Sequence, residues 1–509
     1  MNRFLPAVCA AFLAAIAAAQ VPSLPQQIAA RITPNDLKAD VSFLASDALQ
    51  GRGTPSPGLD VAAEYVAAQF RRAGLEPAGD DGYFQTAPYA SVTPNLDGIE
   101  LTLEAAGQVI KLEKASMALL EAAALDLSHA PVLKVSLADP AALDALAAEQ
   151  VKGKVLLVEV PDTSALSPED RRKAFTTMSR VPAFAAKLRA ALVIQLRTSG
   201  QPTNPNARLR EVAASSPPVP TLLVWDAAIR DALADAKPGP VEATFSAHIA
   251  APTVAPVKLR NVIGVLRGSD PSLKDTYVLL TAHYDHLGVR GTGDGDHIYN
   301  GANDDASGTA SVIEIAAALA ALPSRPKRTI VFIALFGEEL GDLGSRYYSQ
   351  HPLFPVARTL ADINLEQLGR TDDSEGPRLA QFNLTGFDYS NLAAFFTKAG
   401  EETGIQVVKH EKNSDSYFGR SDNAAFAIAG IPSTTISVTY IFPDYHRPGD
   451  EWPKLDYDNL AKVDWTVALG VLRMADSTEP PQWNKENPRT AVFVQAREAA
   501  VTSPATKLQ

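Results

Sequence analysis

Residues 281–308 read TAHYDHLGVRGTGDGDHIYNGANDDASG, a polar stretch that directly follows the apolar run Tyr277–Leu280. The apolar run is typical of a buried strand, and in open α/β sheets the active site lies where such strands end. His283 and Asp285 are two residues apart, so on an extended backbone their side chains point the same way. A carboxylate in that position can fix the tautomer of an imidazole that binds a metal.

The second part of this stretch, residues 301–308, leads straight into an alanine-rich helical pattern from Thr309 to Leu322. Asp304 is therefore expected at a helix entrance. A plainer interpretation stays open on these residues alone: Asp304 or Asp305 is an N-cap, and His283 with Asp285 is a surface pair.

Further apolar strands are also followed by residues that can bind a metal. The strand 328–336 ends before Glu338 and Glu339, the strand 361–365 ends before Glu366, and a strand that ends near Tyr440 precedes His446. The expected strand ends and the helix entrance would bring these ligands to one sheet edge: His283, Asp304, Glu339, Glu366 and His446. Two imidazoles and three carboxylates suit a pair of divalent ions, zinc first and cobalt or manganese as alternatives, with one carboxylate bridging.

This ligand set predicts a two-metal hydrolase, in which ions roughly 3.5–4 Å apart share a water and polarise a carbonyl group. Glu338 is left over beside the ligand Glu339. It is the candidate general base that takes the proton of the water and passes it to a leaving amine. Solvated surface charge could explain one or two such residues, but hardly five at the same edge.

From residue 257 onward, strands and helices alternate, which predicts an α/β fold with a mostly parallel central sheet covered by helices. We expect a catalytic domain over 257–476, completed by an N-terminal part at 30–115 with helices near 36–49 and 60–73 and a hairpin near 96–112. Residues 116–251 form an expected small α/β insert without a ligand cluster, where His129 and His248 stand alone. Residues 477–509 are polar and aperiodic apart from 490–499, which suggests a peripheral or partly disordered tail.

Charge and length narrow the function further. A chain of 509 residues is long enough for about two to four domains. The formal net charge is -12, and no basic run is present. Because a phosphate binder needs a basic face, nucleic acid and anionic membrane are not expected partners.

The first residues have the pattern of a secretory signal peptide over 1–19. Met1-Asn2-Arg3 precedes an apolar segment that ends in small residues, and cleavage is expected near Ala19. Cys9 is the only cysteine and lies inside this segment, so after the expected cleavage the mature protein would have no thiol ligands, nucleophiles or disulfides. A secreted or periplasmic protein without a stable membrane anchor is expected.

These motifs closely resemble those of the dinuclear zinc aminopeptidases, a family that also contains glutamate carboxypeptidase II and transferrin receptor. The resemblance rests on HYDHLG at His283, GANDDASG at Gly301, FGEELGDLGS at Phe336, NLEQLGR at Asn364 and DYH at Asp444. The stretches FLASDALQGRGTPSPG and GLEPAGDDGYFQ are similar to the lead-in of bacterial exported members. The resemblance covers most of residues 37–472, and the insert fits that family's protease-associated domain.

The resemblance implies a role for each site residue. One zinc is held by His283 and Glu366, the other by Glu339 and His446, with Asp304, or alternatively Asp305, as the bridge. Glu338 is then the general base and Asp285 the partner of His283. Tyr445 resembles a tyrosine that stabilises the oxyanion in some members, or it only lines the pocket. Two positions depart from the pattern: Glu366 stands where many members have Asp, and Asn423 where a His is common.

The expected function is therefore an exported metallo-aminopeptidase that acts on peptides. A carboxypeptidase on the same scaffold is the nearest alternative, because Arg370, Arg420 and Arg447 lie near site motifs. A glutaminyl cyclase is disfavoured by the insert. A receptor or binding protein without metals is disfavoured by the complete ligand set, and metal content discriminates between these classes.

Overall fold

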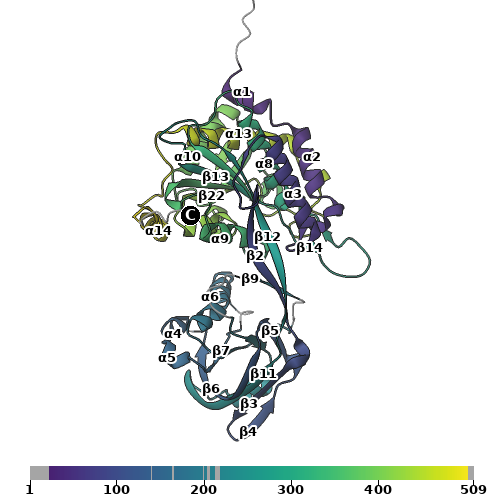
Figure 1. Ribbon diagram of the computed structural model, residues 1–509, viewed down its shortest axis with the longest axis vertical. Coiled ribbons are helices and arrows are strands. Elements are labelled where there is room, and N and C mark those ends of the chain that lie inside the picture. The colour runs from purple at the N-terminus through teal and green to yellow at the C-terminus, as the bar shows by residue number, and fades with distance from the viewer. Residues whose placement is uncertain are drawn as a thin grey trace, which may run out of the picture. The chain divides into compact units, whose positions relative to one another are not determined.

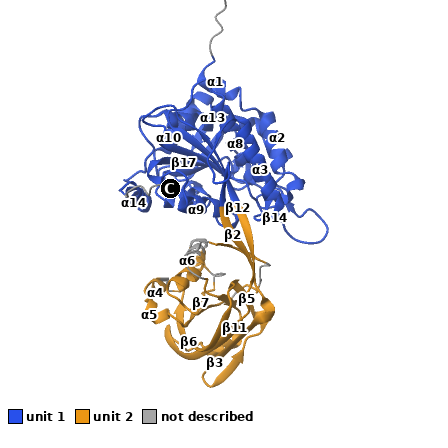
Figure 2. Cartoon of the chain, in the orientation of Figure 1, with its two compact units in different colours: residues 1–86, 260–509 blue, residues 87–259 orange. Residues whose placement is uncertain are grey.

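The computed structural model describes residues 22–502 apart from 139, 163–165, 199, 203–206 and 213–217. The signal peptide expected at residues 1–19, with Cys9, lies outside the described residues. Contacts divide the chain into two compact units (Figure 2). One unit takes the chain up to Thr86 and from Arg260 onward, and the other consists of Ala87–Leu259.

The first unit is built around a mixed sheet with parallel strands at its centre (Figure 1). These strands lie in the order β22 (Ser433–Ser437), β17 (Thr359–Leu365), β13 (Tyr277–His283) and β16 (Thr329–Leu335). Every residue of β13 and β16 is buried, because helices and loops cover both faces, and this explains their continuous apolar sequences. His283 pairs with Leu335, so the two strands end side by side.

Antiparallel strands extend this sheet on both sides. They are β12 (Thr253–Leu266) beside β16 and, beyond β22, β20 (Gln381–Leu384) with β21 (Gln406–Val408). β2 (Phe84–Thr93) and β9 (Arg208–Glu211) follow β12 in the strand order, and β9 belongs to the second unit by its residues. Short pairs complete the strands: β1 (Glu76–Pro77) on β12, β14 (Gly288–Val289) with β15 (Ile298–Tyr299), and β18 (Asp372–Asp373) with β19 (Gly376–Pro377). The predicted α/β class with a mostly parallel centre is confirmed.

Helix α8 (Ser307–Ala320) is the central helix of the unit and begins at the polar loop of the site. It contacts α2 (Pro34–Leu44), α3 (Pro57–Arg72) and α13 (Tyr457–Asp476), as well as β13. Neighbouring elements cover α8 on nearly all sides, so almost all of its residues are buried. This burial explains why its sequence is rich in small apolar residues. The remaining helices of the unit are α1 (Leu24–Ala29), α9 (Leu343–Gln350), α10 (Leu392–Thr403), α11 (Asn413–Ser416), α12 (Asn423–Ile428) and α14 (Ala491–Thr502).

The second unit has its own sheet and its own cores. Its strands lie in the order β4 (Gln108–Lys111), β3 (Ile99–Ala105), β11 (Gly239–Ile249), β6 (Leu125–Ser136), β7 (Val155–Glu159), β8 (Leu192–Leu196), β10 (Thr221–Val224) and β5 (Met117–Glu121). Its helices are α4 (Pro140–Asp144), α5 (Ala148–Val151), α6 (Pro168–Lys187) and α7 (Ala227–Ala232).

The contacts divide the chain differently from the boundaries expected at residues 116 and 251. The expected hairpin near 96–112 forms as β3 and β4, but β3 pairs along its length with β11. The hairpin therefore belongs to the second unit, which begins at Ala87 and ends at Leu259. A local pattern identifies a hairpin, whereas the distant strand that it joins is visible only in the fold.

The segment after α13 packs against the first unit rather than forming a loose tail. Trp483 is buried with Tyr389 and Phe418, and Phe493 packs against them. The ring nitrogen of Trp483 donates a hydrogen bond to the carbonyl oxygen of Gly430 at 3.0 Å. Arg497 on α14 donates to backbone carbonyls of the loop before β17. The expectation of partial disorder is therefore corrected for residues 477–502, because a few apolar anchors suffice to hold a mostly polar segment.

Across residues 22–502, leaving out the undescribed positions, no helix combines the length and the apolar character that crossing a bilayer requires.

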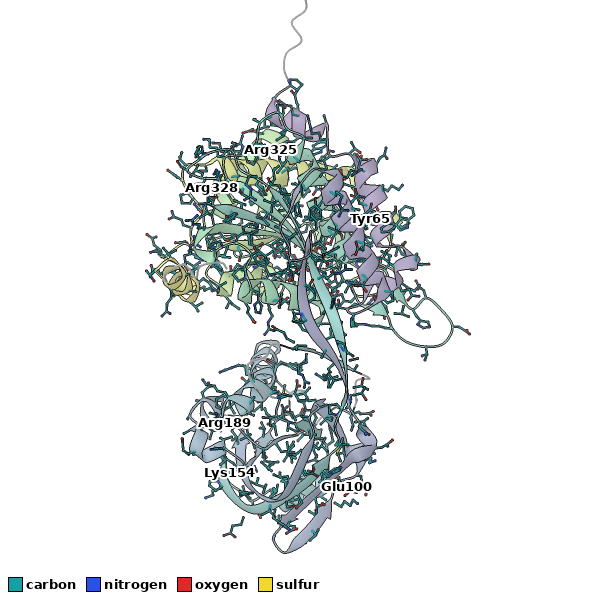
Figure 3. The ribbon with its side chains drawn as sticks, viewed as in Figure 1. Tyr65, Glu100, Lys154, Arg189, Arg325 and Arg328 are labelled. Carbon is teal, nitrogen blue, oxygen red and sulfur yellow. The ribbon has the colours of Figure 1, made fainter. Side chains whose placement is uncertain are left out.

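A buried carboxyl pair joins the helices around α8. The hydroxyl of Tyr65 on α3 (Figure 3) donates to Asp40 of α2 at 2.7 Å, and Asp40 faces Glu314 of α8. Arg72 reaches Glu314 at 3.4 Å, and Asp464 of α13 is buried nearby. Burial raises the pKa of Asp40 to about 6 and, together with the charge of Asp40, the pKa of Glu314 to about 8.

We expect this pair to make the stability of the protein depend on pH. Carboxyl groups with a raised pKa in the folded state stabilise the fold while they stay protonated, so their contribution is lost as pH rises through about 6 and 8. The melting temperature of the wild type should fall between pH 5 and pH 9 more steeply than that of Glu314→Gln. Exposed Glu479→Gln, as control, should keep the wild-type slope, and parallel curves for wild type and Glu314→Gln would contradict the account.

Candidate metal centre

The carboxyl ends of the central strands deliver the predicted site residues to one edge of the sheet. His283 is the last residue of β13, and Glu366 directly follows β17. Glu338 and Glu339 lie in a single helical turn after β16, reached through Gly337 with a φ of 70°. In this left-handed conformation a side chain would be strained, so glycine allows the backbone to turn sharply there.

The first ligand group consists of His283, Asp304 and Glu366, whose ligand atoms all lie within 4.8 Å of one another. Nε2 of His283 is 3.3 Å from Oδ1 of Asp304. The other ring nitrogen, Nδ1, faces Asp285, 3.2 Å from its carbonyl oxygen and 3.5 Å from its carboxylate. Asp285 thus holds the imidazole ring of His283 at Nδ1, while Nε2 points toward the other ligands of the first group.

The second ligand group shares Asp304 with the first. Oδ2 of Asp304 is 3.2 Å from Nε2 of His446, which is also 3.4 Å from Oε1 of Glu339. The two oxygens of one carboxylate therefore face the two histidines that the sequence pattern singled out. Burial alone would raise the pKa of Asp304, but the facing imidazoles of His283 and His446 outweigh burial and hold the pKa far below the ordinary value.

His286 belongs to this second group, although the sequence pattern did not single it out. With Asp304 and Glu339 it forms a set whose ligand atoms lie within 4.8 Å, and its Nδ1 is 2.7 Å from Oε1 of Glu339. The sequence signal that could have identified His286 is its position as the second histidine of the HYDH motif, three residues after His283. His446 and His286 therefore both lie close to the carboxylate of Glu339.

Asp304 and Asp305 have different environments. Oδ1 of Asp305 accepts hydrogen bonds from the backbone nitrogens of Gly308 at 2.9 Å and Gln367 at 3.2 Å. Asp304, in contrast, faces His283 and His446. This contrast favours Asp304 over Asp305 as the shared carboxylate.

Asp450, a second residue that the sequence pattern did not single out, holds the loop that carries Asp304. Its carboxylate accepts hydrogen bonds from the backbone nitrogens of Asn303 and Asp304 at 3.0–3.1 Å. Burial raises the pKa of Asp450 to about 6. The loop before α8 is thus fixed by a carboxylate from a distant segment.

Arg52 is fully buried and donates hydrogen bonds to three separate segments around the site. Its guanidinium donates hydrogen bonds to the carbonyl oxygens of Tyr284 at 2.8 Å, Asn300 at 2.7 Å, Gly301 at 3.0 Å and also Leu44. Burial lowers its pKa to about 10, so the group stays charged at neutral pH beside the acidic site. The turn-rich sequence around Arg52 gave no sign of this role.

Glu338 is placed between the ligand groups and the Asp285 carboxylate. Its Oε2 is 4.0 Å from Nε2 of His283, and its backbone nitrogen donates to Oδ1 of Asp285 at 3.1 Å. Asp285 also accepts a hydrogen bond from Thr54 at 3.1 Å. Burial raises the pKa of Glu338 well above its ordinary value, which suits a group that must accept and release a proton.

Tyr445 stacks on the ring of His446, with ring centroids 4.0 Å apart. Burial and the surrounding carboxylates raise its pKa, so its hydroxyl keeps its proton at neutral pH. Tyr445 also lines a small cavity together with Glu366 and Arg420. Arg370, in contrast, is engaged by Asp372 at 2.6 Å and Asp444 at 3.0 Å.

Both departures from the motif pattern have structural explanations. The longer arm of Glu366 still brings its carboxylate into the first ligand group, where Gln367 Nε2 donates to it at 3.3 Å. Asn423 is fully buried, donates to the carbonyl oxygen of Phe418 at 2.9 Å and accepts from Thr435 at 2.9 Å. Asn423 therefore supports α12 and β22 rather than facing the ligand groups.

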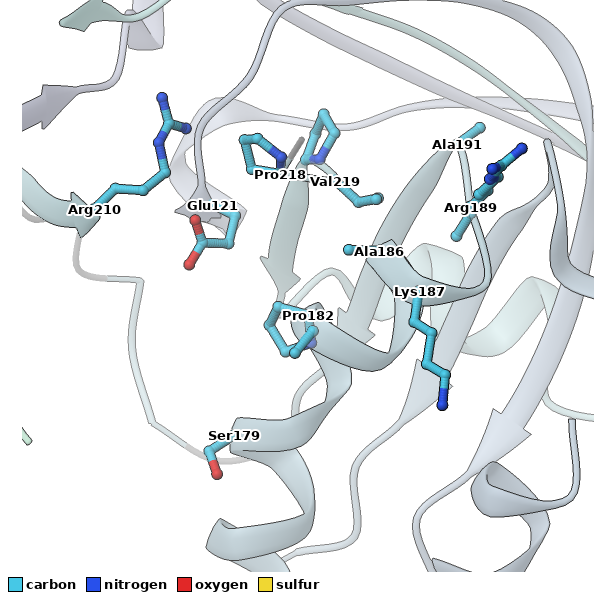
Figure 4. Close-up of a pocket in the computed structure, with 13 residues that line it drawn as sticks. Glu121, Ser179, Pro182, Ala186, Lys187, Arg189, Ala191, Arg210, Pro218 and Val219 are labelled. Carbon is cyan, nitrogen blue, oxygen red and sulfur yellow. The ribbon is translucent and has the colours of Figure 1, made fainter. Parts of the chain in front are cut away.

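A hollow in the second unit contains none of the predicted site residues (Figure 4). It measures about 1180 Å³, and its described lining contains Glu121 and no histidine. His129 and His248, the isolated histidines of that unit, are exposed and pair with Glu104 at 3.3 Å and Asp126 at 2.6 Å. The volume of a hollow therefore does not identify the candidate site here. The grouping of histidine and carboxylate ligands identifies it.

The side chains of the two ligand groups fit divalent metal ions. Nε2 of His283 and Oε1 of Glu339 are buried and make no hydrogen bond, although both point at other ligand atoms. Unpaired buried donors and acceptors are costly unless another partner satisfies them. Imidazole nitrogens mixed with carboxylate oxygens are the donor set that zinc takes in hydrolases.

Residues 261–471 match the model of Peptidase family M28. Aminopeptidase YwaD of Bacillus subtilis is 28% identical over 233 residues, which cover 45% of this chain and 47% of that protein. A probable zinc metalloprotease of Leptosphaeria maculans is 35% identical over 200 residues, which cover 39% and 44%. The chain thus spans about half the length of the curated relatives it matches.

A solved structure is similar over most of its length. The aminopeptidase from Aneurinibacillus sp. strain AM-1 matches with a TM-score of 0.53 and 20% identity, over 88% of this chain and 95% of that one. At this identity, the match shows a common fold.

Proposed function

Because residues 261–471 match the model of Peptidase family M28, we propose that the protein is a zinc metallo-aminopeptidase that removes N-terminal residues from peptides. The single observation that supports this proposal most strongly is the shared carboxylate of Asp304, which faces His283 with one oxygen and His446 with the other. Curated relatives named as an aminopeptidase and as probable zinc metalloproteases support the same class.

We assign two zinc ions to the two ligand groups. His283 and Glu366 would hold one ion, Glu339 and His446 the other, and Asp304 would bridge them. His286 is a further candidate for the second ion or a holder of Glu339. When bound, zinc lowers the pKa of a water and polarises a carbonyl oxygen.

The residues around the ligands would then carry out the proton transfers. Glu338 would take a proton from the attacking water at its carboxylate and deliver it to the nitrogen of the leaving amine. Asp285 would keep His283 in the tautomer with Nε2 free. Tyr445, still protonated at neutral pH, would donate its hydroxyl to the developing oxyanion.

The remaining assignments are proposals of the same kind. The second unit is proposed to be a protease-associated domain, supported by its position as an insert before the catalytic strands. Export to the periplasm or the medium rests on the pattern of residues 1–19. Cobalt or manganese could replace zinc, because the ligand types suit all of these ions.

A small substrate panel tests the proposal together with its metal dependence. Aminoacyl p-nitroanilides with a free amine should be hydrolysed, whereas N-acetylated anilides and N-blocked peptides with a free carboxylate should not. Chelation should abolish hydrolysis and lower the melting temperature, since ligands that bind only the folded state stabilise it, and added zinc should restore both.

Each other result points to a different class. Cleavage only of substrates with a free terminal carboxylate would indicate a carboxypeptidase on the same scaffold. Absence of zinc and of any hydrolysis would indicate a receptor or binding protein.

A further inference from the structure

A cavity of about 100 Å³ opens beside the first ligand group. Glu366 and Tyr445 form its wall toward the metal ligands, so a group bound in the cavity lies next to the scissile bond of a substrate. The volume suits one side chain of a few heavy atoms, since a single water needs about 10–15 Å³. This places the cavity where a substrate side chain would be recognised.

The walls of this cavity supply hydroxyl donors that no described acceptor uses. The hydroxyl of Tyr440 is buried and makes no hydrogen bond within the described residues. Thr385 accepts a hydrogen bond from the backbone nitrogen of Thr435 at 2.9 Å, which leaves its own proton free to donate. The Ser437 side chain likewise has no hydrogen bond to the described part of the chain, although it is almost completely buried.

Acceptors are scarcer in the same walls. The Glu366 carboxylate belongs to the first ligand group and already accepts from Gln367 Nε2. Oε1 of Gln367 is a buried acceptor without a partner among the described residues. The cavity thus offers several hydroxyl donors against one free acceptor, which favours a ligand that accepts hydrogen bonds.

A cation completes this donor set. The guanidinium of Arg420 lies over the ring of Tyr417, 4.4 Å from its centroid, and forms no ion pair with any described residue. Arg370, in contrast, is already bound by two carboxylates. An unpaired guanidinium beside hydroxyl donors complements a carboxylate better than any neutral group.

We propose that this cavity is a carboxylate subsite and that Arg420 makes the enzyme prefer peptides with an N-terminal glutamate or aspartate. The inference rests on the proposed function and names the substrate class of the same site. The carboxylate could come from the side chain of the N-terminal residue or from the chain end of a peptide. The position beside Glu366 favours the side chain of the residue whose bond is cleaved.

Glutamyl and glutaminyl p-nitroanilides have side chains of nearly the same size and shape, so a difference between them reports the effect of the carboxylate charge. The kinetics are measured with the zinc-loaded protein. The wild type should show a higher kcat/KM for the glutamyl than for the glutaminyl and leucyl anilides. Arg420→Gln should lower kcat/KM for the glutamyl anilide about tenfold, because a charge-assisted hydrogen bond is lost at an exposed arginine. The same variant should lower kcat/KM for the glutaminyl anilide much less than for the glutamyl anilide, because the neutral amide does not form the charge-assisted hydrogen bond.

Two further variants test the subsite. Arg325→Gln changes an exposed arginine (Figure 3) that does not line the cavity, and it should behave as wild type with every anilide. Tyr440→Phe removes a buried hydroxyl without a partner, so the fold should remain stable while the preference for the glutamyl anilide falls. Calorimetry gives a readout without turnover: L-glutamate should bind more tightly than L-glutamine, and Arg420→Gln should remove the difference.

The outcomes separate this inference from the proposed function. Equal kcat/KM for the glutamyl and glutaminyl anilides, or an equal loss for both in Arg420→Gln, would overturn the subsite while leaving the aminopeptidase intact. Hydrolysis that requires a terminal carboxylate and depends on Arg420 would support the subsite with the chain end as its source and would overturn the aminopeptidase. If no substrate is cleaved, Arg420-dependent binding of glutamate supports the subsite alone, and its absence overturns it.

Discussion

Replacing Glu338 by glutamine is expected to lower kcat for a free-amine anilide by about 10³-fold, because the amide cannot accept the proton of the water. The exchange preserves the size of the side chain. It also preserves the backbone hydrogen bond from Glu338 to Asp285, which the side chain does not make. Steady-state kinetics of the zinc-loaded variant measure the effect.

The neighbouring carboxylate provides the matched control for this experiment. Glu339 faces His286 and His446, so Glu339→Gln should weaken zinc binding, whereas Glu338→Gln should retain the zinc content and the melting temperature of the wild type. A Glu338→Gln enzyme with near wild-type kcat would show that another group accepts the proton.

Replacing Arg52 by methionine is expected to reduce the free energy of unfolding by about 4 kcal/mol or more, because buried carbonyl groups lose their donor and each unsatisfied group costs about 1–3 kcal/mol. The affected carbonyls belong to Leu44, Tyr284, Asn300 and Gly301. Domains are typically stable by only about 5–15 kcal/mol, so the variant should unfold at much lower urea concentration.

Urea unfolding of the zinc-saturated protein, followed by circular dichroism, measures this loss. Arg325→Met changes an exposed arginine and should shift the free energy of unfolding by about 0.5 kcal/mol or less. Arg52→Lys should be intermediate, because it keeps the charge but has fewer donors and a shorter reach. An Arg52→Met protein as stable as the control would mean that water or other groups satisfy these carbonyls.

The central strands and most of the candidate ligands could be predicted because each signal is local. A fully buried parallel strand is a continuous apolar run. A polar residue at its last position or directly after it, such as His283 or Glu366, is therefore expected at the sheet edge. Glu338 and Glu339 could be placed for the same reason. The register between the strands is not given by such local signals, and only the fold shows that His283 pairs with Leu335.

The supporting residues could not be predicted, because their partners are distant in sequence. Arg52 lies in a turn-rich link, and only the fold brings it to the carbonyls of Asn300 and Gly301. Asp450 likewise reaches the loop of Asp304 from a segment near α13. Such buried polar contacts leave no periodic pattern, so they appear only when the backbone is in place.

The central claim is that the protein is an aminopeptidase whose activity depends on two zinc ions shared through Asp304. Titration of zinc into the chelated protein, with hydrolysis of a free-amine anilide and bound metal followed together, tests it most directly. We expect binding that saturates at two zinc ions per chain and hydrolysis that rises with their occupancy. Two bound zinc ions without hydrolysis of any free-amine substrate, or full hydrolysis in the chelated protein, would contradict it.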